Sequence, residues 1–171
     1  MLILEGDIYH NNKDEIKKLI KKKGYRYVFS SKVPDLRDEE QYILEKYQGN
    51  NTGYSLKSGI WQDDDKNRII MFWLKDEDMN TVVTIIRDDD MPEEVRDFII
   101  DIGGYEPELD EEIIQDEMFQ RELERINRQY DYMLMHPNPH QAKYPRVHEY
   151  FVNRMRQEAI EELKRRYGGD K

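Results

Sequence analysis

The chain of 171 residues contains no cysteine. Disulfide bonds, thiolate nucleophiles and cysteine-ligated zinc sites are therefore excluded. No segment approaches the roughly 18 consecutive apolar residues of a membrane span. The first residues also lack the basic and then apolar pattern of a signal peptide. We therefore expect a cytoplasmic protein without a membrane partner.

Recognisable catalytic motifs are missing as well. The sequence shows no P-loop, no dinucleotide-binding glycine pattern and no G-x-S-x-G elbow. We therefore expect a protein that is not an enzyme, with no catalytic residue, no cofactor and no bound metal.

Three patterns come near a metal site. Asp63-x-Asp65-x-Asn67 begins like a calcium loop, but Arg68 and Leu74 stand where the loop needs glycine and glutamate. The spacing of His136, His140 and His148 matches no zinc motif. Pro34-Asp35 with the later Asp64-x-Lys66 has the residue order of PD-(D/E)xK nucleases, so a metal-dependent nuclease is one alternative function.

The net charge of −10 is unevenly distributed. Residues 1–61 carry 11 basic and 9 acidic side chains, residues 62–124 carry 6 and 22, and residues 125–171 carry 10 and 6. The strongly acidic middle disfavours contact with nucleic acid and favours basic protein surfaces. A row of lysines at 17–23 could contact phosphate, but we interpret it as a helix face that is either solvated or neutralised by the acidic middle of the same chain.

Residues 67–74 contain the only unbroken run of six large apolar residues. A run that is apolar at every position predicts a strand covered on both faces. Further strands are expected at 25–29, 54–61 and 80–87, with a short one possible within 1–9. The short, polar connections around 62–66 and 75–79 predict an antiparallel meander. The fold class is therefore α+β, with an antiparallel sheet of three to five strands.

Apolar spacing and capping residues predict five helices. They begin near Asn11 or Asn12, at Asp35, after Asp90, near Glu108 and after Pro145. We expect the first helices to pack on one face of the sheet and the last two to form a C-terminal helical hairpin. This divides the chain into an α+β body at 1–104 and a helical hairpin at 105–171, which could also form one continuous domain.

The acidic side chains of residues 88–124 are the main candidates for function, and Asp97 and Asp101 are among them. An acidic ridge on helices can imitate a polyanion for a basic groove. The alternative is an acidic surface that is only solvated and binds no partner. We expect a partner protein with a basic, nucleic-acid-binding surface and no direct binding of nucleic acid. The predicted partner-binding residues are Asp88, Asp89, Asp90, Glu93, Glu94, Tyr105, Glu106, Glu108, Asp110, Glu111, Glu112, Asp116 and Glu117.

The composition, free of cysteine and rich in lysine, asparagine, isoleucine and tyrosine, is typical of phage or mobile-element proteins. This favours a small inhibitor of a defence protein, acting in the host cell cytoplasm. The second alternative is an assembly protein. Phe119, Leu123, Ile126, Tyr130 and Met133 form an apolar seam that could join two copies as a homodimer through residues 119–133.

Overall fold

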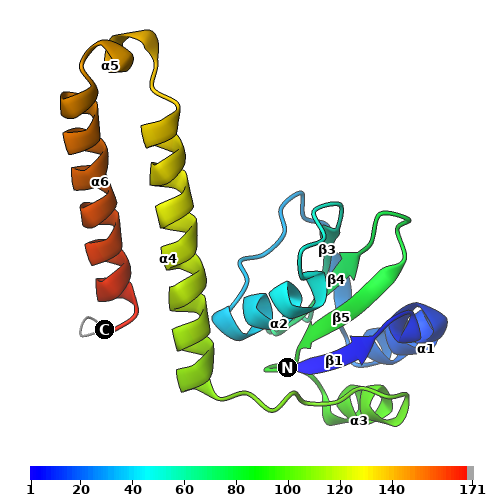
Figure 1. Ribbon diagram of the computed structural model, residues 1–171. Coiled ribbons are helices and arrows are strands. Elements are labelled where there is room, and N and C mark those ends of the chain that lie inside the picture. The colour runs from blue at the N-terminus through cyan, green and yellow to red at the C-terminus, as the bar shows by residue number, and fades with distance from the viewer. Residues whose placement is uncertain (169–171) are drawn as a thin grey trace. The chain divides into compact units, whose positions relative to one another are not determined.

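The structure is a computed structural model that describes residues 1–168, and it divides into two compact units. The first unit is Met1–Leu109 and the second begins at Asp110. The first unit contains a five-stranded sheet with helices, and the second is a helical hairpin, which confirms the α+β class (Figure 1).

The sheet is antiparallel throughout, in the order β1-β5-β4-β3-β2. Its strands are β1 (Leu2–Glu5), β2 (Arg26–Val28), β3 (Ser55–Gln62), β4 (Arg68–Lys75) and β5 (Thr81–Arg87). The meander of β3, β4 and β5 is confirmed, and β4 lies at the centre of the sheet. The backbone of Tyr105 forms an isolated antiparallel bridge with Ile3, a residue of β1, and so adds one bridge at the outer edge of that strand.

Helices cover both faces of the sheet, which explains the apolar run in β4. Ile69 and Met71 face a core built with α1 (Ile8–Lys22) and α3 (Glu93–Asp101). Their neighbours Ile70 and Phe72 are also buried and point to the opposite face. That face is covered by α2 (Asp38–Gln48), so the expectation that the helices pack on one face was wrong.

Two helix starts in the first unit differ from the prediction. Helix α1 begins at Ile8 rather than after Asn11 or Asn12, and it brings Tyr9 into the core with 2% of its surface exposed. Helix α2 begins at Asp38 rather than near Asp35, and the Glu40 side chain accepts a hydrogen bond from the Arg37 backbone N–H at 2.8 Å. Burial of Tyr9 accounts for the early start of α1, whereas a local capping box between Arg37 and Glu40, rather than one at Asp35, marks the start of α2.

The second unit consists of α4 (Glu111–Met135), α5 (Pro139–Lys143) and α6 (Pro145–Arg166). Helices α4 and α6 pack side by side, and Ile114, Phe119, Val152 and Leu163 are buried in this unit (Figure 1). The short helix α5 was not predicted; Asn138 caps it by accepting a hydrogen bond from the Gln141 N–H at 2.8 Å. Helix α4 starts three residues later than expected because Asp110 caps it.

Within residues 1–168, none of the helices combines the length and the apolar character that crossing a membrane requires.

Candidate partner-binding surface

The predicted binding residues are divided between the two units. Asp88, Asp89 and Asp90 follow β5, and Glu93 and Glu94 open α3. Tyr105, Glu106 and Glu108 lie in the segment after α3, and the last five, Asp110, Glu111, Glu112, Asp116 and Glu117, belong to the start of the second unit. Each unit therefore has its own acidic surface.

Asp88 is occupied within the first unit. Its carboxylate accepts hydrogen bonds from the N-terminal ammonium of Met1 and from the guanidinium of Arg96, and its side chain is only 12% exposed. Burial raises the pKa of Asp88, but the two cations outweigh burial and hold that pKa below its ordinary value. Asp88 is therefore a structural residue in this unit.

Three more of the predicted acids have intramolecular cations. Arg37 pairs with Asp89, Arg96 also pairs with Glu106, and Lys23 lies 2.7 Å from Glu94. The hydrogen bonds from Arg37 and Lys23 lower the pKa values of Asp89 and Glu94. These carboxylates would have to exchange an existing partner for a new one on binding.

Asp90 and Tyr105 are also engaged. The backbone oxygen of Asp90 accepts a hydrogen bond from the Tyr25 hydroxyl at 2.6 Å. Tyr105 is 41% exposed, and its hydroxyl donates to Glu5 at 3.0 Å, while Tyr47 donates to the same carboxylate at 2.5 Å. Part of the Tyr105 ring remains open to solvent, in a fixed position.

Three other acids of the first unit form what we call the α3 stripe: Glu93, Asp97 and Asp101. They are spaced four residues apart, are exposed, and enter no ion pair within residues 1–168. They lie opposite the buried Val95 and Ile99. Carboxylates at this spacing share one helix face and repel one another. The stripe is therefore a row of free negative charge.

Asp101 is unfavourably placed for helix stability. It is the last residue of α3, and the last turn carries no basic side chain. The negative end of the helix dipole lies there, so a carboxylate costs roughly 0.3–1 kcal/mol relative to a cation. By contrast, Glu111 and Glu112 lie in the first turn of α4, where the dipole stabilises them. Folding explains the acids of α4 better than it explains Asp101.

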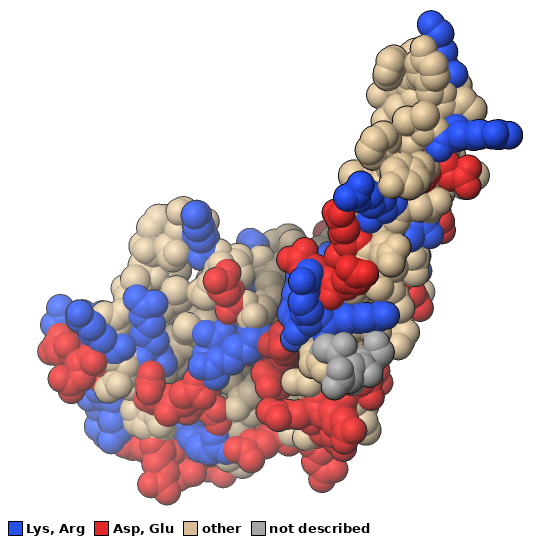
Figure 2. Space-filling view, turned by 90° about the vertical axis from the view of Figure 1, so that its left-hand side faces the viewer, with Lys and Arg blue, Asp and Glu red and all other residues tan. Residues whose placement is uncertain are grey.

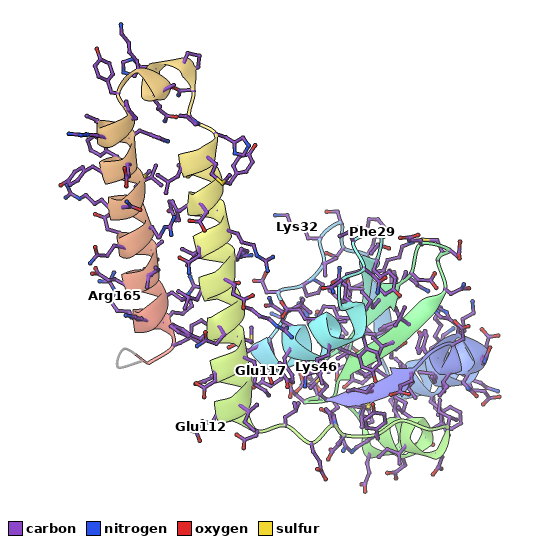
Figure 3. All side chains as sticks on the ribbon, viewed as in Figure 1. Phe29, Lys32, Lys46, Glu112, Glu117 and Arg165 are labelled. Carbon is purple, nitrogen blue, oxygen red and sulfur yellow. The ribbon has the colours of Figure 1, made fainter. Side chains whose placement is uncertain are left out.

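The acids of α4 have mixed roles. Asp110 caps the helix by accepting a hydrogen bond from the Glu112 N–H at 3.0 Å. Glu111 and Glu112 are exposed without an ion pair in the described chain, and Asp116 has a partner. Figure 3 labels Glu112 and Glu117 near the start of this helix.

The other end of the helical hairpin has a different character, and we call it the hairpin tip. Figure 2 shows mainly uncharged and basic side chains there, at the top of the view. Seven large hydrophobic residues of this region are at least 40% exposed: Tyr132, Met135, Tyr144, Val147, Tyr150, Phe151 and Met155. Such exposed hydrophobic side chains are available for contact with a partner.

Within residues 1–168, no group of three or more His, Cys, Asp or Glu side chains is arranged to hold a metal ion. His148 Nε2 lies 2.8 Å from the Met133 carbonyl oxygen, and His136 Nδ1 lies 3.0 Å from that of Tyr132. Asp63 accepts hydrogen bonds from the backbone and side chain of Asn67, which fixes the β3–β4 turn.

Comparison with known proteins gives no guide to function, because no family model, no curated protein and no solved structure matches this chain.

Sequence reasoning did not identify which acids are free. Asp97 and Asp101 belonged to the acidic segment but were not selected, whereas Asp88 and Asp89 were selected and are paired. The four-residue spacing from Glu93 to Asp101, opposite Val95 and Ile99, is a signal that could have singled them out.

Proposed function

We propose that the protein is a small, non-enzymatic binding protein that places an acidic surface on the basic groove of a nucleic-acid-handling protein and inhibits it. The observation that carries this proposal is the α3 stripe. Its three carboxylates are exposed and unpaired within the described residues, and the last stands at the unfavourable end of its helix. Because these carboxylates lower the stability of the fold, binding of a partner explains them better than folding does.

The charge geometry supports such a partner. Residues four apart on a helix rise by about 6 Å, so the stripe presents evenly spaced negative charges on a rigid element. Regular negative charge of this kind attracts basic grooves and accelerates association. The free carboxylates Glu111 and Glu112 on α4 supply a second acidic surface, and Tyr105 supplies a partly exposed aromatic contact. The cysteine-free composition fits a phage or mobile-element inhibitor of a defence protein.

The test compares neutralised variants in a pull-down. The full chain is used as bait in a nuclease-treated bacterial lysate at low and at high salt. The variant Glu93→Gln/Asp97→Asn/Asp101→Asn is compared with a control, Asp64→Asn/Asp65→Asn/Asp78→Asn, which changes the charge equally at exposed turn positions. Asp110 is left unchanged in both because it caps α4.

The wild type and the control should recover one basic nucleic-acid-binding protein at low salt, and added competitor DNA should displace it. The α3 stripe variant should lose it. Equal recovery by the stripe variant would show that this stripe does not bind the partner.

The second candidate function is assembly through the helical hairpin. It is favoured by the exposed hydrophobic residues of the hairpin tip and by the seam on α4, where Leu123, Ile126, Tyr130 and Met133 are only half-buried. A second copy could cover this apolar surface. Sedimentation velocity tests it: an oligomer that dissociates in Leu123→Asp supports assembly. A wild-type monomer over a wide concentration range contradicts assembly.

A further inference from the structure

The first unit contains a hollow between helix α1 and the edge strand β2, with a volume of about 330 Å³. Its residues are distant in sequence from the α3 stripe, and its charged side chains are basic rather than acidic. The residues that line it are Lys17, Lys21, Tyr25, Arg26, Tyr27 and Trp61. Three of these residues are aromatic, and acids are absent from this lining. Arg26 alternates with Tyr25 and Tyr27 along the chain, so its side chain lies on the other face of the sheet, and Lys17 and Lys21 are the cations of the hollow.

The aromatic side chains share one face of the sheet. Tyr27 pairs directly with Trp61 across β2 and β3, and their ring centroids are 5.5 Å apart at an angle of 68°. Trp61 is buried, whereas Tyr27 is 59% exposed because β2 is an edge strand and α1 does not cover it. The hollow thus has a buried aromatic floor, formed by Trp61, and one solvent-exposed aromatic ring, that of Tyr27.

Gly59 helps to hold that floor in place. A Cβ atom at this position would lie 2.6 Å from the Trp73 ring and 2.9 Å from the Trp61 ring. The missing side chain lets the two indoles pack edge to face, with centroids 6.3 Å apart. The floor of the hollow is therefore packed against a second indole ring.

The cations at the rim are free to bind an anion. Lys17 and Lys21 are four residues apart on α1, so they lie on the same helix face. Both lysines are exposed and enter no ion pair within residues 1–168, whereas Lys22 and Lys23 pair with Glu94. Residues 13–26 carry seven basic and two acidic side chains in a chain of net charge −10.

The charge at the two ends of the hollow differs. The Tyr25 hydroxyl points toward the Asp90 backbone, and the carboxylates of Asp63 and Asp90 lie near it. An anionic group would avoid that end and approach the side of Lys17 and Lys21. The hollow therefore favours a ligand with a flat, uncharged ring and an anionic group on one side.

We propose that this hollow binds a nucleotide, with the base against Tyr27 above Trp61 and the phosphate paired with Lys17 and Lys21. Aromatic side chains stack on any base, and lysines pair with phosphate as point charges. The same chemistry is available from a free nucleotide and from one unit of a single-stranded nucleic acid. The site goes beyond the proposed acidic docking function and departs from the expectation that the chain does not contact nucleic acid directly.

The experiment titrates the full chain with three probes: ATP, inorganic pyrophosphate and a single-stranded DNA octamer of mixed sequence. Quenching of tryptophan fluorescence reports binding, because Trp61 forms the floor of the hollow. The variants are Tyr27→Ala and Lys17→Gln/Lys21→Gln. The charge-matched control is Lys13→Gln/Lys18→Gln, on the same helix but outside the hollow. Circular dichroism verifies that each variant is folded.

ATP or the octamer should bind to the wild type and to the control. Tyr27→Ala should weaken binding about tenfold or more, as expected for loss of one stacking contact, and the Lys17/Lys21 variant should weaken it at least as much. Binding of ATP and octamer with similar affinity identifies a free nucleotide as sufficient. Binding of the octamer alone identifies a single strand.

Three results would overturn the proposal. The first is that neither ATP nor the octamer binds. The second is equal affinity for pyrophosphate and ATP, which would show that the base plays no role. The third is equal weakening of binding in the Lys13/Lys18 control, which would indicate attraction to the lysines in general.

Discussion

The guanidinium of Arg87, on β5, donates two hydrogen bonds to the carboxylate of Glu40, on α2, at 2.8 and 2.5 Å. The side chains are 14% and 2% exposed. This pair joins α2 to the sheet. The Glu40 carboxylate also accepts a hydrogen bond from the Arg37 backbone N–H at the start of the helix. Removal of one partner leaves the other charge poorly solvated.

We expect Glu40→Ala to lower the free energy of unfolding by about 3–5 kcal/mol, the usual cost of breaking a buried ion pair. Asp38→Ala is the control, because Asp38 is exposed in the same first helical turn and should cost less than about 1 kcal/mol. Urea denaturation measures both. Similar losses in the two variants would mean that the Glu40 pair is not a main contact between α2 and the sheet.

The α3 stripe should limit stability. Asp101→Lys places a cation at the negative end of the helix and removes repulsion with Asp97, so it should raise the free energy of unfolding by about 0.3–1 kcal/mol. Glu93→Lys acts at the opposite end of the dipole and should not stabilise to the same degree. If Asp101→Lys proves destabilising in urea denaturation, the helix dipole argument for this residue fails.

Stability should fall in acid. The pKa of Asp88 is lowered in the folded state, so the unfolded state binds more protons near pH 4. The contribution of Asp88 is therefore present above its ordinary pKa and is lost as the pH falls through its folded pKa. Arg96→Met removes one of the cations that lower this pKa.

Arg96→Met should accordingly lose less stability than the wild type between neutral pH and about pH 3.5. Urea denaturation at several pH values measures this difference. Parallel curves for the two proteins would show that Arg96 does not couple Asp88 to folding.

The helical hairpin offers a matched pair of neighbours. Val152 is 1% exposed and Phe151 is 54% exposed, although they are adjacent on α6. Val152→Ala should destabilise the second unit by about 2 kcal/mol, whereas Phe151→Ala should change it by less than about 0.5 kcal/mol. Hydrogen exchange of the α6 amides measures the effect in this unit. A larger effect at Phe151 would show that the hairpin tip is buried in solution by an assembly.

The sheet could be predicted because its signal is local. The apolar run in β4 and the β-branched residues of β5 identify these strands within about a residue, and the turns between them set the meander. The start of α1 was wrong because Tyr9 enters the core. The start of α2 was wrong because the residue that caps it at Arg37 is Glu40, and Glu40 is held in place by Arg87, which is distant in sequence. Local capping residues carry no information about such contacts.

The free acids could not be predicted for the same reason. Arg37 neutralises Asp89 only because the segment before α2 approaches the end of β5 in the fold. The hollow beside β2 likewise depends on how α1 covers Tyr25 and leaves Tyr27 open. A charge count describes the segment, whereas the tertiary structure decides which charges remain available.

The pairing of β1 with β5 has a consequence for synthesis of the chain. The first strand has no neighbour in the sheet until residues 81–87 have left the ribosome, and Tyr105 closes its outer edge only later. Such pairing between distant segments slows folding, whereas contacts within a helical hairpin form quickly. The backbone groups of β1 therefore stay unpaired in the nascent first unit until β5 emerges, and a chaperone would be most useful to it during that interval.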